Sequence, residues 1–275
     1  VTGKAGDSLP MSIVQRNLVM LSRFAMFLTD AITRVCDSAL ALVYPQPCHV
    51  CGRSVESRLD GCACRDCWSA TRLFPASAAL CWKCGALARG TIKIESRELV
   101  RCRHCDEDAF AGARACGIYE RALRAVVLSL KRQPYIPGRV AELLATTAQQ
   151  HPLDGCARII PVPLHSQRLL VRGFNQAEVI AAEVSRKTGL PLDSRSLFRT
   201  VHTERHRAGM DAKSRKETVE EAFAVRVTRL IIDESILLVD DVFTSGATAS
   251  ACASALLRAG ARSVFVLTIA RTENF

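Results

Sequence analysis

The apolar positions near the N-terminus recur at helical spacing. From Ser12 to Val43 they stand mostly three or four residues apart, at Ile13, Leu18, Leu21, Phe24, Leu28, Ile32 and Val35. This spacing predicts an amphipathic helix after a disordered tail of residues 1–11, within an N-terminal segment of residues 1–44. Prolines at positions 45 and 47 end the helix, because proline cannot continue one. We expect its apolar face to pack on the rest of the protein; the alternatives are a membrane surface and a partner protein.

A different pattern begins at Ala113, where apolar runs typical of strands alternate with segments of helical periodicity. The strand-like runs span residues 157–164, 235–241 and 263–271, and the helical segments span residues 175–190 and 247–261. Gly189 and Gly260, near the ends of the two helical segments, are typical helix stops. Apolar strands that alternate with helices predict an α/β domain, residues 113–275, around a mostly parallel and buried sheet.

Residues 45–112 have few apolar runs and are rich in cysteine. Nine of the 13 cysteines lie between Cys48 and Cys105, mostly as pairs separated by two residues. Two such pairs can bring four thiolates to one Zn²⁺ ion, and a site of four thiolates leaves no open position for catalysis. We therefore predict a small double zinc ribbon with two structural sites, formed by Cys48, Cys51, Cys64 and Cys67 and by Cys81, Cys84, Cys102 and Cys105.

The residues of this module leave three questions open. Cys62 competes with Cys64 as a ligand, and the cysteine pairs can also combine across the two sites. The module has three alternative roles, which are docking, contact with nucleic acid and stabilisation of the fold, and its residues do not distinguish between them. Paired cysteines of this kind are typical of metal sites in a reducing compartment rather than of a disulfide scaffold.

Composition and charge narrow the class of protein. The 275 residues are 49% hydrophobic and 23% charged, an ordinary globular balance, and the net charge is +10. Residues 113–275 hold 23 basic and 16 acidic residues, which favours polyanionic ligands; a solvated basic surface is the alternative. No apolar run reaches the roughly 20 residues of a membrane-spanning helix, and no secretory signal is recognisable. We expect a soluble, cytoplasmic protein without stable membrane insertion.

The sequence ILLVDDVFTSGAT, residues 236–248, combines a buried strand, two adjacent acids and a loop of small residues. Ligands of open α/β sheets bind beyond the carboxyl ends of the strands, where Asp240 and Asp241 are expected. A small-residue loop at a helix N-terminus offers free backbone N–H groups to an anion. The carboxylates beside it would accept hydrogen bonds from vicinal hydroxyls. The stretch therefore predicts a sugar phosphate site; the alternative is an acidic pair that only caps the loop.

Three stretches resemble known families. The stretch ILLVDDVFTSGAT resembles the signature of type I phosphoribosyltransferases, which bind phosphoribosyl pyrophosphate (PRPP). The stretch IIPVPLHSQRLLVRGFNQAEVIA, residues 159–181, resembles a segment of the ComF family, competence-associated proteins with a phosphoribosyltransferase-like domain and an N-terminal zinc-ribbon region. Residues 203–223 are similar to a third segment of that family, although His206 stands near a usual glutamine and Thr218 at a usual asparagine. The resemblance covers the chain from about residue 45 to its last residue.

The resemblance implies a type I phosphoribosyltransferase-like fold and a set of site residues. Asp240 and Asp241 would hold the ribose hydroxyls. The 5′-phosphate would bind a loop of five residues, Thr244, Ser245, Gly246, Ala247 and Thr248. Lys131 is the candidate for the pyrophosphate and Arg172 and Asn175 are expected in the same cleft, with Lys131 and Arg172 as the catalytic candidates; ordinary surface charges are the alternative for these two. Mg²⁺ is expected to arrive with the PRPP oxygens.

Two classes of function fit these residues. An active transferase would displace pyrophosphate from C1 of PRPP, which needs positioning and charge stabilisation by Mg²⁺, Lys131 and nearby arginines. A binding protein would hold or sense PRPP while the basic surface and the zinc ribbons handle single-stranded DNA with the competence machinery, although aromatic residues, 5% of the chain, are few for stacking. The basic stretch 199–216 is interpreted as a mobile lid, a nucleic-acid contact or a solvated loop, in that order. The sequence indicates neither the acceptor substrate nor the oligomeric state.

Overall fold

The computed structural model describes residues 46–75, 77–88, 100–102, 105–200 and 222–273. The N-terminal helix predicted within residues 12–43 lies outside the described residues, as does most of the basic stretch 199–216. Within the part of the chain that is described, no helix is long and apolar enough to cross a membrane.

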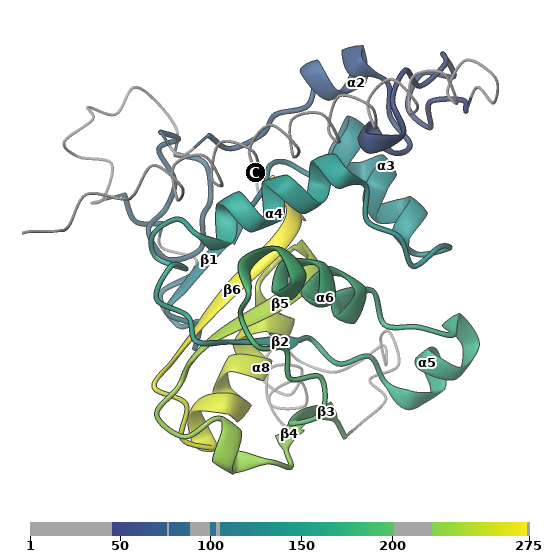
Figure 1. Cartoon of the computed structure of the whole chain (residues 1–275). Coiled ribbons are helices and arrows are strands. Elements are labelled where there is room, and N and C mark those ends of the chain that lie inside the picture. Colours follow the sequence, from purple (N-terminus) through teal and green to yellow (C-terminus); the bar gives the residue numbers. More distant parts are fainter. Residues whose placement is uncertain (1–45, 76, 89–99, 103–104, 201–221, 274–275) are drawn as a thin grey trace, which may run out of the picture.

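A four-stranded parallel sheet forms the centre of the α/β domain (Figure 1). Its strands lie in the order β1 (Gly112–Ala115), β6 (Ser263–Arg271), β5 (Ser235–Phe243) and β2 (Arg158–Pro161). The two central strands pair from Ser235 opposite Ser263 to Phe243 opposite Arg271. Both carry long apolar runs, because helices bury both faces of a parallel sheet.

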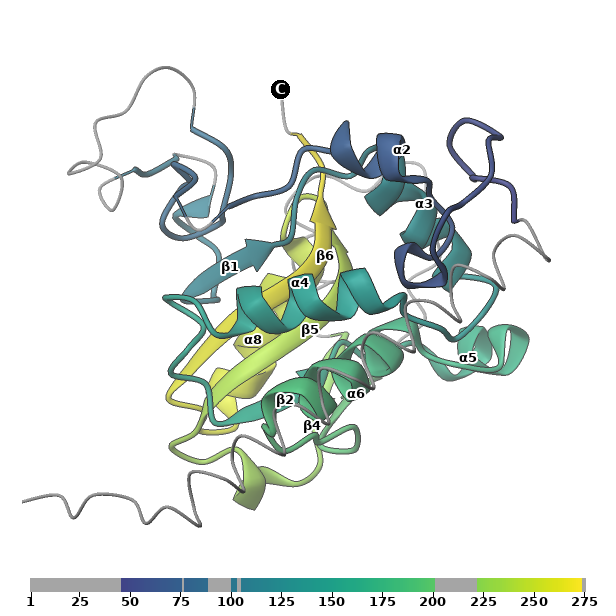
Figure 2. The ribbon, with the colours of Figure 1, turned by 45° about the horizontal axis from the view of Figure 1, so that its top comes forward.

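Helices cover the two faces of the sheet (Figures 1 and 2). The covering elements are α3 (Arg121–Leu130), α4 (Gly138–Ala148) and α6 (Gln176–Thr188) on one face and α8 (Ala247–Arg258) on the other. Side chains alternate along a strand, so the residues of β5 divide between two cores. Leu237 and Val239 pack with α3, α4 and α6, whereas Ile236 and Leu238 pack with α8.

Smaller elements flank the sheet. They are the 3-10 helix η1 (Arg58–Asp60), α2 (Arg65–Ser69), α5 (Ser166–Arg172), the antiparallel strands β3 (Leu197–Arg199) and β4 (Phe223–Val225), and the 3-10 helix η4 (Thr228–Leu230). Helix α5 stands apart from the helices on the sheet (Figure 1) and contains no buried residue. Its Leu170 and Val171 are 85% and 92% exposed, so α5 adds nothing to either core.

The cysteine-rich segment lies near the carboxyl ends of the strands, in two halves (Figures 1 and 2). The first half, with η1 and α2, packs on α3, where Thr71 Oγ1 accepts a hydrogen bond from Ala122 N at 3.2 Å. The second half packs beside β1, where Ala113 N donates to Lys83 O at 2.6 Å. Both halves are therefore joined to the α/β domain by hydrogen bonds rather than carried on a free linker.

The predicted α/β class is confirmed: a domain around a parallel sheet follows two cysteine sets. The helical segment predicted at 175–190 corresponds to α6, which ends before Gly189 in the left-handed conformation, with φ 78°. The segment predicted at 247–261 corresponds to α8. The domain boundaries after residues 44 and 112 stay predictions.

The strand predicted at 235–241 is two residues longer than expected. Val242 and Phe243 continue the ladder, opposite Ala270 and Arg271. The expectation that the acidic pair ends the strand was therefore wrong by two residues. The reason is that both strands of this pair extend beyond the other two, so the ladder continues past the aspartates.

Candidate functional site

Strand β5, the loop after it and helix α8 form a strand–loop–helix unit at the carboxyl end of the sheet. Thr244 and Ser245 are exposed, whereas Gly246 is buried and caps α8. Ala247 N donates to Ser245 Oγ at 3.4 Å, and Ser250 N makes the first helical bond, to Gly246 O at 2.8 Å. The first N–H groups of a helix have no partner within it, so this loop, residues 244–248, presents donors and the positive end of the helix dipole to an anion. We call it the phosphate loop.

Gly246 occupies a position where no other residue fits. A Cβ atom here would lie 2.9 Å from Cζ of Phe243, 3.4 Å from Oδ2 of Asp108 and 3.5 Å from Cε1 of Phe110. Its φ of 84° is also disfavoured for any residue with a side chain. The phosphate loop is therefore held closely against the end of β5 and against the segment that follows Cys105.

The adjacent aspartates precede the phosphate loop by two residues and are both partly exposed. Asp241 N donates to Asp240 Oδ1 at 2.8 Å. Burial raises the pKa of the Asp240 carboxyl to about 7, repulsion by the charge of Asp241 acts in the same direction, and the charge of Lys131 opposes both. Such a pair gains from a ligand that brings hydroxyl donors or a cation to the carboxylates.

Lys131 is the exposed residue that caps the C-terminus of α3. Its ammonium group interacts electrostatically with Asp240, so the turn after α3 lies on the same side of the molecule as the aspartate pair. Lys131 thus lies near enough to Asp240 for its charge to act on that carboxyl. Their roles in binding stay predictions.

Arg172 and Asn175 have structural partners. Arg172, the last residue of α5, donates from Nη1 to Gln176 Oε1. Asn175 caps α6, because its Oδ1 accepts from Ala177 N at 3.1 Å, and its Nδ2 donates to Val162 O at 3.0 Å. These contacts fix the junction between β2 and α6. A direct contact of either residue with a ligand stays a prediction.

One basic residue near the site was not singled out from the sequence. Arg199, expected at the start of a loop, ends strand β3 instead, and its side chain is partly buried. Burial lowers the pKa of its guanidinium, repulsion by Arg168 adds to this, and the Cys252 thiol opposes it. The charges of Asp240 and Arg199 also act in opposite directions on the pKa of the buried Cys252 thiol in α8, which Asp240 raises and Arg199 lowers. The available signal was the adjacent apolar pair Leu197 and Phe198 directly before Arg199, since aromatic and aliphatic residues favour a strand.

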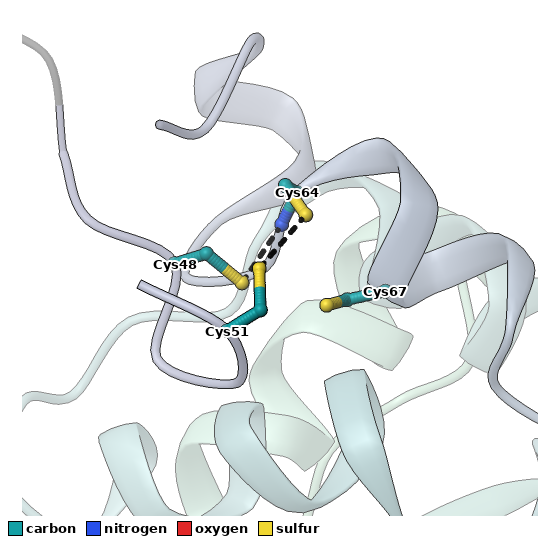
Figure 3. Close-up of side chains that lie close together, drawn as sticks. All are labelled: Cys48, Cys51, Cys64 and Cys67. Carbon is teal, nitrogen blue, oxygen red and sulfur yellow. Dashed lines mark hydrogen bonds between the residues drawn. The ribbon is translucent and has the colours of Figure 1, made fainter. Parts of the chain in front are cut away.

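The first predicted set of cysteines comes together. The ligand atoms of Cys48, Cys51, Cys64 and Cys67 all lie within 4.8 Å of one another, and Figure 3 shows the four side chains converging from two segments of the chain. Cys51 Sγ and Cys64 Sγ are 3.6 Å apart. Cys62 is outside this cluster, and burial raises the pKa of its thiol to about 11. Four converging thiolates fit a tetrahedral Zn²⁺ site, which we call the first tetrad.

The second predicted set also comes together. Cys81, Cys84, Cys102 and Cys105 form a cluster of the same size, the second tetrad. Cys81 Sγ lies 3.8 Å from Cys105 Sγ, and Cys84 Sγ lies 3.4 Å from Cys102 Sγ. The cysteine pairs therefore combine within the two sets and not across them, and this donor set also fits a structural Zn²⁺.

A cavity of about 1180 Å³ lies between the second tetrad and the strand–loop–helix unit. Its wall includes all four cysteines of the tetrad on one side. On the other side the wall includes Phe243, Ser245 and Arg271. The phosphate loop and the second tetrad thus face a common space.

Comparison with known proteins gives relatives along most of the chain. No protein-family model matches it. The DNA utilization protein YhgH of Salmonella typhi is 28% identical over 259 residues, which cover 90% of this chain and all of that protein. Competence protein F of Haemophilus influenzae is 34% identical over 122 residues, which cover 44% of this chain and 53% of that protein. The YhgH protein of Escherichia coli K12 is 35% identical over 115 residues, 42% of this chain and 49% of that protein.

Similar solved structures cover about half of the chain. They include a purine phosphoribosyltransferase from Pyrococcus horikoshii, with 16% identity, a TM-score of 0.32 and coverage of 49% of this chain and 82% of that one. They also include a glutamine PRPP amidotransferase from B. subtilis, with 18% identity, a TM-score of 0.35 and coverage of 50% and 29%.

Proposed function

We propose that this chain, a member of the ComF family, binds PRPP together with Mg²⁺ at the strand–loop–helix unit and acts as a phosphoribosyltransferase-like protein in DNA utilisation. The observation that carries the proposal is the acidic pair beside an open helix N-terminus. Asp240 and Asp241 precede a loop whose Gly246 is closely packed and whose neighbours Thr244 and Ser245 are exposed. Acceptors for hydroxyls and donors for a phosphate stand next to each other, as a sugar phosphate requires.

Each part of the ligand has complementary groups. The ribose 2′- and 3′-hydroxyls donate to the carboxylates of Asp240 and Asp241. The 5′-phosphate accepts from the backbone N–H groups and hydroxyls of the phosphate loop. The pyrophosphate lies toward Lys131, whose charge acts on Asp240. Mg²⁺ supplies charge neutralisation to the phosphate oxygens when it is bound with PRPP.

In the transferase reaction, the bond between C1 of the ribose and the pyrophosphate oxygen breaks, and the pyrophosphate leaves with the bonding electrons. A lone pair of the acceptor forms the new bond to C1, and the acceptor releases a proton. Lys131 stabilises the charge that develops on the leaving group, because its ammonium is attracted to a polyanion more strongly as charge accumulates. The phosphate loop and the aspartates hold C1 in place, and Arg172 acts through Gln176 at the start of α6.

The cellular role that we propose is the handling of DNA during uptake. Two relatives carry the names DNA utilization protein and Competence protein F, which supports this assignment. A role in the cytoplasm fits the thiolate sites, which persist in a reducing compartment.

The second candidate is a protein that binds PRPP and single-stranded DNA without catalysis. Strands β3 and β4 favour it, because arginines stack on aromatic rings there. The guanidinium carbon of Arg226 lies 4.0 Å from the ring centroid of Phe198, and that of Arg199 lies 5.3 Å from that of Phe223. Phe223 is buried, so only the partly exposed pair of Arg226 and Phe198 offers the cation–aromatic surface that suits single-stranded nucleic acid. Pyrophosphate release across a panel of nucleobase acceptors separates the two candidates, since a protein without catalysis would bind PRPP and release none.

Calorimetric titration of PRPP with Mg²⁺ tests the proposed site. The wild type should bind, and Asp240→Asn combined with Asp241→Asn should weaken binding by more than about a hundredfold, because each lost charge-assisted hydrogen bond contributes about 1.5–3 kcal/mol. Asp233→Asn is the matched control. Asp233 is an exposed aspartate before the other end of β5, and it pairs with Arg262 at 2.9 Å. If the wild type does not bind PRPP, the proposed site is wrong.

A further inference from the structure

Phe243, the last residue of β5, contacts the phosphate loop, Phe110 and Arg271. Its ring meets that of Phe110 edge to face, with centroids 5.7 Å apart and an angle of 84°. The guanidinium carbon of Arg271 lies 5.3 Å from the centroid of the same ring. Phe243 also contacts the position of Gly246, so any movement of Phe243 reaches the phosphate loop.

The first cysteine pair of the second tetrad is joined to Phe243 through Arg271. Arg271 is 3% exposed and lies opposite Phe243 in the sheet. Its Nη1 donates to the carbonyl oxygen of Cys84 at 2.5 Å. A buried guanidinium is costly without partners, so the position of Cys84 and the position of Arg271 depend on each other.

The second cysteine pair is joined to the loop through residues 108–110, which we call the 108–110 segment. Asp108 N donates to the carbonyl oxygen of Cys105 at 3.2 Å. Ala109 N donates at 2.9 Å to Oγ of Ser250 in the first turns of α8. Phe110, 1% exposed, fills the space beside Gly246. The two cysteine pairs of one tetrad thus hold the two sides of the same loop.

We propose that the second tetrad and the 108–110 segment position the phosphate loop, so that metal binding by the tetrad and phosphate binding by the loop are coupled. The inference rests on the proposed function only in assigning a phosphate to the loop. Packed side chains transmit displacement because the interior has few voids. Coupling of this kind typically changes affinity by about 5- to 150-fold, and by the same factor in both directions.

Titration of ribose 5-phosphate, and of PRPP with Mg²⁺, into Phe110→Ala tests the coupling. Both ligands carry the 5′-phosphate, so both should bind about tenfold more weakly than to the wild type. Phe110→Leu, which fills much of the space, should restore most of the affinity. Trp68→Ala is the control, since Trp68 is equally buried but packs beside the first tetrad. Its folded protein should bind ribose 5-phosphate, which lacks the pyrophosphate, within twofold of the wild type.

Hydrogen exchange gives a readout that requires no ligand. In Phe110→Ala, and in wild-type protein from which the zinc of the second tetrad has been removed, the amides of residues 244–248 should exchange faster. Equal exchange in the wild type and in Phe110→Ala overturns the inference whether or not any phosphate binds. Failure of the wild type to bind either ligand, with faster exchange in the variant, instead counts against the proposed function alone.

Zinc release measures the coupling in the opposite direction. With a colorimetric chelator, ribose 5-phosphate should slow the release of one zinc ion per chain by about tenfold and leave the other unchanged. The protected ion belongs to the second tetrad if Phe110→Ala abolishes the protection and Trp68→Ala does not. A wild type that binds ribose 5-phosphate but releases both ions at an unchanged rate contradicts the inference.

Discussion

Each cysteine tetrad consists of four thiolates, but the two tetrads pack on different parts of the α/β domain. Around the first tetrad, Val55 and Trp68 share a core with helices α3 and α4. Around the second, Phe110 shares a core with Phe243 and helix α8. One tetrad is therefore built into the helical layer on one face of the sheet, and the other into the strand–loop–helix unit.

The first tetrad also reaches the turn between α3 and α4, which begins at Lys131. A Cβ atom at Gly61 would lie 2.3 Å from Cγ of Pro137, and one at Gly138 would lie 2.9 Å from Cδ2 of Leu59. These approaches show that the first half of the cysteine-rich segment packs closely on the end of the turn that leads into α4. Under the proposed function, each tetrad supports one end of PRPP. The first tetrad supports the residues that bind the pyrophosphate, and the second supports the loop that binds the 5′-phosphate.

Trp68→Ala should have the largest effect on folding. Trp68 is 1% exposed, donates from Nε1 to Asp60 O at 2.9 Å, and lies with its ring centroid 4.8 Å from the guanidinium carbon of Arg139. Truncation of a buried tryptophan lowers the free energy of unfolding by about 3–5 kcal/mol. Urea denaturation followed by circular dichroism measures this change.

The second tetrad supplies the matched control, Trp82→Ala. Trp82 is only partly buried and lies under the guanidinium of Arg101, at 4.6 Å. Its loss should lower the free energy of unfolding by about 1 kcal/mol or less. If the two tryptophan variants were equally destabilised, the prediction that only the first tetrad is built into the helical core would be contradicted.

Lys131→Ala should have the next largest effect, on binding rather than on folding. Loss of one charged contact to pyrophosphate weakens PRPP binding by about 1.5–3 kcal/mol, or roughly 10- to 150-fold. Ribose 5-phosphate, which lacks the pyrophosphate, should bind Lys131→Ala at least as well as the wild type. Calorimetric titration with both ligands measures the difference.

Arg132→Ala is the control for this variant, because Arg132 is the exposed neighbour of Lys131 on the same turn. Its PRPP affinity should stay within about threefold of the wild type, as expected for loss of a screened surface charge. Equal weakening of PRPP and ribose 5-phosphate by Lys131→Ala would contradict the division of the ligand between the two tetrads.

The pH dependence of PRPP binding should reveal Asp240. Its pKa is raised to about 7, mainly by burial, so the carboxyl is protonated below pH 7 and a better acceptor for ribose hydroxyls above it. Affinity should therefore rise by up to about tenfold per pH unit toward pH 7 and then level. Lys131→Ala should move this midpoint upward, because the lysine charge lowers the pKa. In Asp240→Asn this carboxyl is absent, so any pH dependence of PRPP binding that remains between pH 5.5 and 8.5 comes from protonation of PRPP itself.

The same group affects folding with the opposite trend. The pKa of Asp240 is higher in the folded protein than in the unfolded chain, so its contribution to stability is present below about pH 4 and is lost as the pH rises to about 7. Asp240→Asn should unfold at a higher urea concentration than the wild type at pH 8, and at a similar one at pH 4. If Asp240→Asn were less stable than the wild type at pH 8, the folded protein would stabilise the charged form of Asp240, which contradicts the prediction.

Local patterns in the sequence predicted the parts of the fold that depend on near neighbours. The two-residue cysteine spacing predicted both tetrads, because two pairs suffice for four thiolates. The run from Ile236 predicted β5 and its loop, because apolar residues, acids and glycine follow one another directly. Gly189 predicted the end of α6 through its left-handed conformation.

Contacts between distant segments could not be predicted in this way. Phe110, Arg271 and Phe243 meet only because β5 and β6 are neighbours and the second tetrad folds back beside them, and no spacing in the sequence encodes this. The partial burial of Arg199 was likewise hidden, since it depends on strand β3 pairing with the distant strand β4. The motif of the candidate site could therefore be predicted from the sequence, but the packing contacts that hold the loop in place could not.

Arg72→Ala should have the smallest effect. Arg72 follows the first half of the cysteine-rich segment and pairs at 2.7 Å with both Glu120, before α3, and Glu273, after β6. All three side chains are partly exposed, so the network should contribute only about 0.5–1 kcal/mol to the free energy of unfolding, and less at 1 M salt. Urea denaturation at low and high salt measures this, with Arg262→Ala, which removes an exposed pair at the other end of the sheet, as the control. The pair with Glu273 joins the first half of the cysteine-rich segment to the strand that carries Arg271. If Arg72→Ala lowered the free energy of unfolding by more than about 2 kcal/mol, or changed the PRPP affinity, the two tetrads would be coupled to each other. They would then not support the ligand independently.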